Sequence, residues 1–299
     1  MSLYTPTRTA RSSFVTLRGL RQHLLQWGPP PGPETPLLVL LHGWMDVAAS
    51  FQFLVDAMAQ DRAVVALDWR GFGHSDGTPA DGYWFPDYLG DLDALLDLLS
   101  PQASVDLLGH SMGGNVVMSY AGVRPRRVRR LINLEGFGLP DTQPEQAPGR
   151  LAMWLDELRQ RPELRHYPSA DAVALRLRKN NPRLSPDKAQ WLARQWAREL
   201  PDGQWQLLAD PLHKRSHPML YRSAEILAGW RLIQAPTLWV QGEHSSPTQI
   251  FGDRYGDAEL QQRLACVPQL QRQRLAQAGH MLHHDQPQAL AQLLERFLA

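Results

Sequence analysis

The chain has 299 residues, of which 43% are hydrophobic and 20% are charged, a globular balance that argues against disorder. Its 31 basic and 30 acidic residues leave a formal net charge of +1, so no global field recruits nucleic acid or a membrane surface. The single cysteine, Cys266, excludes an intrachain disulfide and favours a reducing compartment.

The first residues, MSLYTPTRTARSS, are polar and lack the apolar segment of a secretory signal. Nowhere do about eighteen apolar residues run without interruption, as a transmembrane helix requires. We therefore expect a soluble cytoplasmic protein, monomeric or homodimeric, that acts on a small molecule and binds neither nucleic acid nor membrane.

Short β-rich runs then alternate with longer helical ones, which predicts a mainly parallel sheet covered by helices. Residues 14–17 and 20–27 are interpreted as a leading antiparallel pair. Further strands are expected at 37–41, 63–67, 105–108, 128–134, 236–240 and 270–275. Helices are expected at 50–59, at 87–99, after GHSMGG as far as residue 121, and at 288–298.

The alternation of strand-like and helical runs stops between about residues 140 and 230, where no convincing buried strand appears. Helical stretches are expected at 149–161, 169–180, 186–200 and 218–229. Five of the ten tryptophans lie in this region and are expected to fill the core of a small helical subdomain: Trp154, Trp191, Trp196, Trp205 and Trp230. The sequence therefore predicts a core made of residues 1–139 and 231–299, interrupted by a helical cap at 140–230.

The stretch Gly109-His110-Ser111-Met112-Gly113 is a G-x-S-x-G sequence. Aliphatic residues precede it and an apolar helical stretch follows, which is the strand–turn–helix setting of a nucleophile elbow. The turn is strained and crowded, so small residues are needed two positions on either side of the serine. Ser111 is therefore the candidate nucleophile.

Two further motifs accompany this elbow: LHGWMD at 41–46 and DWRGFGHS at 68–75. With them, essentially the whole chain resembles the α/β-hydrolase fold family, nearest to the branch of serine hydrolase-like proteins and lidded esterases. The resemblance implies a mostly parallel eight-stranded sheet with a helical cap after the sixth strand. It also implies an oxyanion hole made by the backbone amides of Trp44 and Met112, with His42 and Asp68 shaping loops.

A serine hydroxyl needs a base to remove its proton. The stretch GHMLHHDQP at 279–287 follows the last strand and resembles the family's histidine loop, which makes His280 the candidate base. A His280/His284 pair could suggest a metal, but the glutamate of H-E-x-x-H and a third ligand are missing. We therefore expect no metal and no cofactor, and we expect His283 and His284 to be pocket-wall or solvated residues.

The orienting acid is harder to assign. Most of the family carries it after the seventh strand, where this chain has Ser245 in the aspartate's position. Glu135, at the end of the expected sixth strand, lies 24 positions after Ser111, enough for one helix and one strand between them. It follows strand residues, an odd place for a free charge unless that charge is paired. Glu135 is the preferred acid, Glu243 is the alternative, and operation without an acid stays open.

A nucleophilic serine, a base and an oxyanion hole together catalyse acyl transfer. We therefore expect cleavage of a carboxylic ester with an apolar acyl group. The family also holds serine enzymes that cleave thioesters, amides and carbon–carbon bonds. Two other classes stay open: a non-catalytic binding protein on the same scaffold, and a cofactorless peroxidase or lyase that uses the same elbow.

Overall fold

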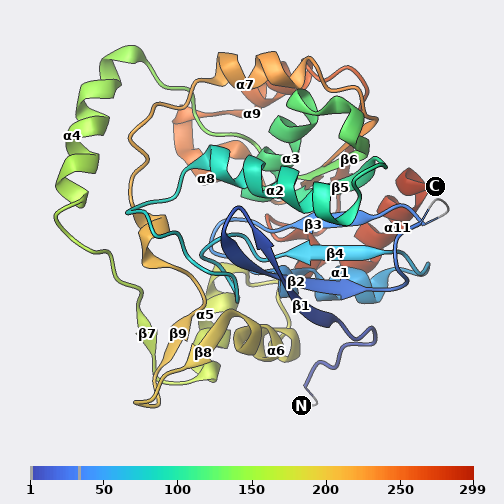
Figure 1. Ribbon diagram of the computed structural model, residues 1–299, viewed down its shortest axis with the longest axis horizontal. Helices are drawn as coiled ribbons and strands as arrows, with labels where there is room; N and C mark the ends of the chain where they lie inside the picture. The colour runs from blue at the N-terminus through green and yellow to red at the C-terminus, as the bar shows by residue number, and fades with distance from the viewer. Residues whose placement is uncertain (1–2, 33–34) are drawn as a thin grey trace.

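The structure, a computed structural model, describes residues 3–32 and 35–299, and its centre is one eight-stranded sheet (Figure 1). The strand order is β1–β2–β4–β3–β5–β6–β10–β11. The β1/β2 and β2/β4 pairs are antiparallel, and the remaining pairs are parallel. The strands are β1 (Arg11–Leu17), β2 (Leu20–Trp27), β3 (Leu38–Leu41), β4 (Val64–Leu67), β5 (Val105–His110), β6 (Val128–Leu134), β10 (Thr237–Gly242) and β11 (Leu270–Leu275).

Helices cover both faces of the sheet, which explains the continuous aliphatic runs of its central strands. In β3, Val39 and Leu41 belong to the apolar cluster on one face, whereas Leu38 and Leu40 belong to the cluster on the other. The first cluster includes side chains of α2 (Phe85–Leu99), α3 (Met112–Val123), α7 (Ser223–Trp230) and α9 (Asp257–Leu264). The second includes side chains of α1 (Gln52–Ala57), α10 (Leu282–Asp285) and α11 (Pro287–Leu298).

The fold class expected from the sequence is therefore confirmed, and each expected strand of the main sheet is present. Two helices between β10 and β11 were not expected from the sequence, namely α8 (Pro247–Phe251) and α9. Both are short, at 5 and 8 residues, so they contain too few turns for a clear apolar periodicity.

Between β6 and β10 the chain leaves the main sheet and forms α4 (Ala147–Glu157), α5 (Ala170–Asn180) and α6 (Pro186–Trp196). It also forms a small antiparallel sheet of β7 (His166–Tyr167), β9 (Trp205–Leu207) and β8 (Ala197–Glu199), which the sequence analysis did not predict. The helix expected over 186–200 ends at Trp196, because the next residue turns to an extended conformation and begins β8. Strands of two or three residues are too short to show an alternating pattern.

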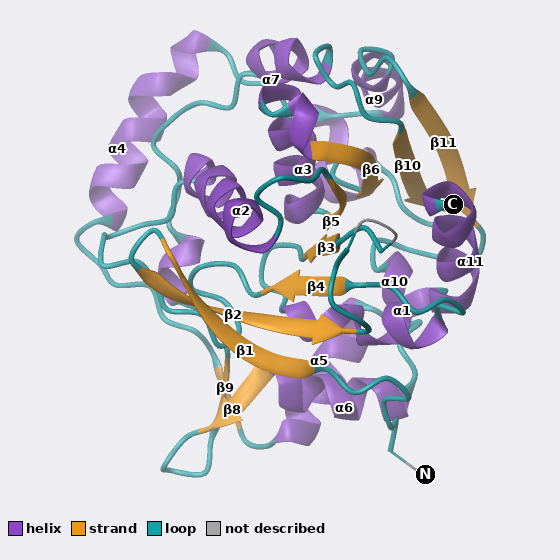
Figure 2. Cartoon of the chain, turned by 45° about the vertical axis from the view of Figure 1, so that its right-hand side comes forward, coloured by secondary structure: helices purple, strands orange, loops and turns teal. Residues whose placement is uncertain are grey.

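This segment is not uniform (Figures 1 and 2). The α5 and α6 pair has its own apolar cluster, whereas α4 has no buried residue and lies at the edge of the molecule. Helix α7 was expected to belong to the cap, but it packs against α3, and Trp230 belongs to the core of the main sheet. The helical cap as a separate unit therefore ends before Ser223.

The prediction for the five tryptophans is corrected in part. Trp191, Trp196 and Trp205 pack against the α5 and α6 cluster while only partly buried. Trp154 lies on the exposed helix α4, and Trp230 lies in the main core.

No helix in the described part of the chain is both long enough and apolar enough to cross a membrane.

The α3/α7 contact generates a paired test at two glycines. A Cβ at Gly122 would overlap the carbonyl group of Gly229, whereas a Cβ at Gly229 would meet nothing within 4 Å. We expect Gly122→Ala to lower the free energy of unfolding by about 1–3 kcal/mol, because overpacking forces the helices apart. Gly229→Ala should raise it by about 0.5–1 kcal/mol, since alanine loses less entropy in a helix. Urea denaturation of both variants measures this, and equal effects would contradict the close approach.

Candidate active site

Ser111 lies on a strained turn between β5 and α3. Its φ of 53° and ψ of −114° are rare for a residue with a side chain. A Cβ at Gly109 would overlap the backbone of Gly113, and a Cβ at Gly113 would overlap the carbonyl of Leu41. Only glycine fits at these two positions, so the G-x-S-x-G spacing has a steric cause. The backbone amide of Ser111 donates to the carbonyl of Leu134, which fixes the turn on β6.

His280 lies in the loop between β11 and α10, and its ring links two other side chains. Its Nε2 lies 3.1 Å from Ser111 Oγ, and its Nδ1 lies 2.6 Å from Glu135 Oε2. With Nδ1–H donating to the carboxylate, the lone pair of Nε2 faces the serine hydroxyl. The structure thus joins three residues that are far apart in the sequence in one line of hydrogen bonds.

Glu135 is the residue directly after β6, and it is only 1% exposed. Its φ of 56° turns the side chain away from the strand and toward the end of neighbouring β10. There the amide of Gly242 donates to Oε1 at 2.6 Å, and the hydroxyl of Ser245 donates to Oε2 at 2.7 Å. Ser245, which stands at the position expected from the sequence to hold an acid, therefore donates a hydrogen bond to Glu135.

Glu243 is placed differently, with about half of its side chain exposed. Its carboxylate accepts the amide of Gln277, and this hydrogen bond holds the pKa of Glu243 below its usual value. Its Oε2 lies 3.9 Å from Nε2 of His244, and the charge of Arg274 also acts on it. His280, by contrast, is paired with Glu135.

Two backbone amides flank the serine. Met112 is the first residue of α3, so its N–H has no acceptor within the helix. Trp44 precedes Met45, whose φ of 59° bends the loop after β3. Among the described residues, neither the Met112 amide nor the Trp44 amide donates to another protein group. Both N–H groups are thus available to a ligand.

His42 and Asp68 hold the loops around the site. His42 Nε2 accepts the amide of Trp69 at 3.1 Å, and burial lowers the pKa of His42 to about 4. Asp68 accepts the amides of Ala48 and His74 at 2.7 and 3.0 Å. These contacts connect the loop after β3 to the loop after β4.

His283 and His284 are buried, whereas the sequence led us to expect pocket-wall or solvated residues. They are 0% and 4% exposed, because α10 turns them inward against α1 and the loop after β3. His284 Nε2 lies 3.0 Å from the hydroxyl of Ser50. Burial lowers the pKa of His284 to about 3 and that of His283 well below its usual value. The motif alone could not show this, since a four-residue helix has no clear inner face.

Comparison with known proteins agrees with the fold. Residues 36–287 match the α/β-hydrolase fold family, and the chain belongs to that family. Over 119 residues it is 36% identical to a serine hydrolase-like protein of Danio rerio, a match that covers 39% of this chain and 35% of that protein. It is 26% identical to serine hydrolase-like protein 2 of Homo sapiens over 282 residues, covering 91% of this chain and 88% of that protein.

A solved structure gives a similar result. The thioesterase domain from the curacin biosynthetic pathway is 28% identical, with a TM-score of 0.83, and the match covers 96% of this chain and 99% of that domain. The family and these relatives support a hydrolase.

His213 connects the segment before α7 to the active-site loops. Its ring is stacked between Phe72 and Tyr83, with centroid distances of 3.7 and 3.6 Å. Its Nε2 lies 3.2 Å from the carbonyl oxygen of Arg70, and its own carbonyl accepts the indole N–H of Trp44 at 3.3 Å. Burial lowers the pKa of His213 to about 3.

This shift predicts a pH dependence of stability. Between the folded pKa of about 3 and the ordinary value of 6.5, the unfolded chain binds one more proton at His213. Stability is therefore lost as the pH falls through this window, by at most about 1.4 kcal/mol per pH unit. We expect His213→Phe, which keeps an aromatic ring in the stack, to flatten the pH slope of urea unfolding measured from about pH 4.5 to 6. The same change at exposed His166 is the control, and an unchanged slope in His213→Phe would contradict the assignment.

Proposed function

We propose that the protein is a serine hydrolase that cleaves a carboxylic ester through an acyl-serine intermediate. In this proposal Ser111 is the nucleophile, His280 the general base and Glu135 the orienting acid. The observation that supports it most strongly is the line of hydrogen bonds from Ser111 Oγ through His280 to Glu135. The strained backbone at Ser111 supports it too, because strain of this kind is retained where function requires it.

The proposed reaction has two steps. His280 Nε2 takes the hydroxyl proton while Ser111 Oγ attacks the ester carbonyl, and the collapse of the tetrahedral intermediate releases the alcohol with that proton. Water, activated by the same nitrogen, then attacks the acyl-serine and releases the acid. The amides of Trp44 and Met112 are the proposed donors to the oxyanion, each contributing about 3–4 kcal/mol to the stability of the transition state.

Glu135 fits the role of the acid because its carboxyl group is held in a fixed place. Its oxygens accept hydrogen bonds from a backbone amide, a hydroxyl and an imidazole N–H. It keeps the imidazole in the tautomer whose Nε2 accepts the serine proton, and it stabilises the imidazolium that forms. Among the residues that the structure describes, Glu243 makes no hydrogen bond or ion pair with His280.

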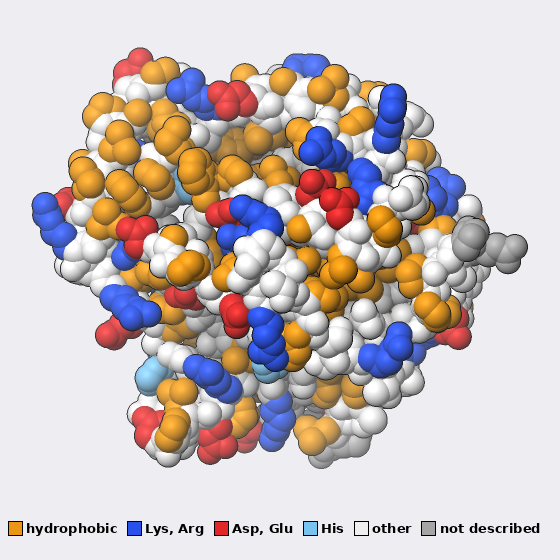
Figure 3. Space-filling model, in the orientation of Figure 1, with side chains coloured by type: hydrophobic (Ala, Val, Ile, Leu, Met, Phe, Trp, Pro, Cys, Tyr) orange, Lys and Arg blue, Asp and Glu red, His pale blue; other side chains and the backbone are white. Residues whose placement is uncertain are grey.

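The substrate is proposed to carry an apolar acyl group. Large apolar side chains are exposed on α4 and on the loops that surround the site (Figure 3). We call these residues the apolar rim: Trp44, Trp84, Leu139, Leu151, Met153, Leu155 and Met219. Exposed apolar patches of this kind mark binding surfaces, and α4 buries no side chain of its own that would account for them. We propose that α4 acts as part of a lid over the acyl site.

The first test is of the nucleophile. Ser111→Ala should lower kcat for a p-nitrophenyl ester at least about a thousandfold, because no other group can form the acyl intermediate. Mass spectrometry should show a single fluorophosphonate adduct on Ser111 of the native protein. Equal ester turnover by the native protein and Ser111→Ala would end the proposal and favour a binding role for the scaffold.

The second test separates the two candidate acids. Glu135→Gln should lower kcat by about a thousandfold or more, because the amide can donate to Nδ1 and hold the imidazole in the wrong tautomer. Glu243→Gln is the matched control and should stay within about twofold of the native protein, since its side chain faces solvent. Circular dichroism checks the fold of both variants. The reverse pattern of kcat values would assign the acid to Glu243.

A further inference from the structure

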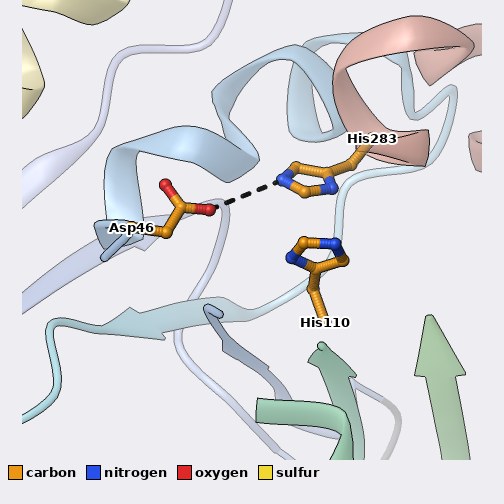
Figure 4. Close-up of side chains that lie close together, drawn as sticks. All are labelled: Asp46, His110 and His283. Atoms are coloured by element: carbon orange, nitrogen blue, oxygen red, sulfur yellow. Dashed lines mark ion pairs between the residues drawn. The ribbon is translucent and has the colours of Figure 1, made fainter. Parts of the chain in front are cut away.

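A second cluster of ionisable side chains, drawn in Figure 4, is not used in the reaction proposed above. It adjoins the proposed active site, because the ring centroid of His110 lies 4.9 Å from that of His280. Asp46, His110 and His283 come from the loop after β3, the end of β5 and α10. They are 3%, 2% and 0% exposed, so water does not solvate them. One nitrogen or oxygen atom from each lies within 4.8 Å of the other two, and Asp46 Oδ2 lies 4.0 Å from His283 Nε2.

The polar atoms that face this space have no hydrogen-bond partner among the described residues. They are Asp46 Oδ2, His110 Nδ1 and His283 Nε2. The other ring nitrogen of His283 also lacks a partner, but one ion can bind only one nitrogen of a ring. The indole of Trp196 acts on the Asp46 carboxyl group from α6, but its N–H makes no hydrogen bond of ordinary geometry with any described residue. Buried polar groups are nearly always paired, so three such atoms in one place call for a ligand.

The other atoms of the same side chains are firmly held. His110 Nε2 lies 2.8 Å from the backbone carbonyl of His280, so it carries the proton, and His110 Nδ1 is left with a lone pair toward the cluster. Asp46 Oδ1 accepts the amide of Val47 at 2.8 Å and the hydroxyl of Ser50. A ligating histidine that donates its second N–H to a carbonyl, beside a hydrogen-bonded carboxylate, is the usual outer shell of a protein metal site.

We propose that Asp46, His110 and His283 bind one divalent cation of the zinc class. Two imidazole nitrogens and one carboxylate oxygen are a ligand set that suits Zn²⁺, whereas Ca²⁺ and Mg²⁺ prefer oxygen ligands alone. Each of these three atoms can offer a lone pair to the ion, and the carboxylate offsets part of the charge of the ion. The proposed metal site uses neither Glu135 nor His280.

The distances require a small closure around the ion. With bonds of about 2.0–2.1 Å, tetrahedral ligand atoms lie about 3.4 Å apart. Asp46 Oδ2 and His283 Nε2, now 4.0 Å apart, therefore approach by about 0.6 Å, and the widest pair approaches by at most about 1.4 Å. Side-chain rotation and the loop that carries Asp46 can supply movements of this size.

Such an ion would stabilise the active site without touching substrate. Asp46 lies two residues after Trp44, His110 directly precedes Ser111, and His283 lies three residues after His280. One ion would thus join the loop of the proposed oxyanion hole, the nucleophile turn and the histidine loop. From the sequence no metal was expected, because the His280/His284 pair lacks the glutamate of H-E-x-x-H and a third ligand. In the structure His280 faces Ser111, and His284 contacts Ser50.

The experiment uses the full chain with any affinity tag removed. The protein is stripped with dipicolinate, incubated with zinc chloride and passed through a gel-filtration column, and bound zinc is measured by plasma mass spectrometry. We expect one zinc per chain in the native protein and less than about a tenth of that in His283→Phe or Asp46→Asn. His283→Phe keeps the ring beside Phe51, so the packing is retained while the ligand nitrogens are lost. His166→Phe, at an exposed histidine, should keep the full equivalent.

A crystal structure of the zinc-treated native protein gives a second measurement that does not depend on a folded variant. An anomalous peak at the zinc edge, bonded to the three side chains, would support the proposal. A single water molecule in that place, or less than about a tenth of an equivalent of zinc in the native protein, would overturn it. Full zinc retention by His283→Phe would also overturn it, because the ion would then be bound elsewhere.

Discussion

The arrangement of the proposed active site depends on the hydrogen bonds made by the buried carboxylate of Glu135. It accepts hydrogen bonds from Gly242 at the end of β10, from Ser245 just beyond it and from His280 after β11. A carboxyl group that is 1% exposed needs these hydrogen-bond donors, and the donors come from segments that only the folded sheet brings together. The same interactions therefore stabilise the carboxylate and position the imidazole.

Backbone strain is concentrated at the same edge of the sheet. Met45, Ser111 and Glu135 all have positive φ, and each lies just after one of the adjacent parallel strands β3, β5 and β6. Loops at the carboxyl ends of parallel strands form the binding crevice of open α/β sheets. In this protein the turns at Ser111 and Glu135 bring a hydroxyl and a carboxylate to the two ring nitrogens of His280. The cost of the strain is offset by a well-packed sheet with apolar clusters on both faces.

The segment between β6 and β10 joins the core to different degrees along its length. Helix α7 is part of the core, α5 and α6 have a cluster of their own that includes Phe53 of α1, and α4 buries nothing. Local stability follows the number of buried apolar contacts, so α4 is the element best suited to move. This difference in burial is consistent with the proposed role of α4 as part of a lid, because α4 carries part of the apolar rim.

The sequence by itself determined the fold class, the strands of the main sheet and the turn at Ser111. These features depend on local patterns: aliphatic runs for doubly covered strands, and glycines where a Cβ would overlap the neighbouring backbone. It also pointed to Glu135, because a charge at the end of a buried strand needs a partner. The tertiary structure decided what that partner is, since His280 and Ser245 approach Glu135 only when β6 pairs with β10. It also decided that α7 belongs to the core and that His283 faces Asp46 and His110, because both follow from contacts between residues distant in the chain.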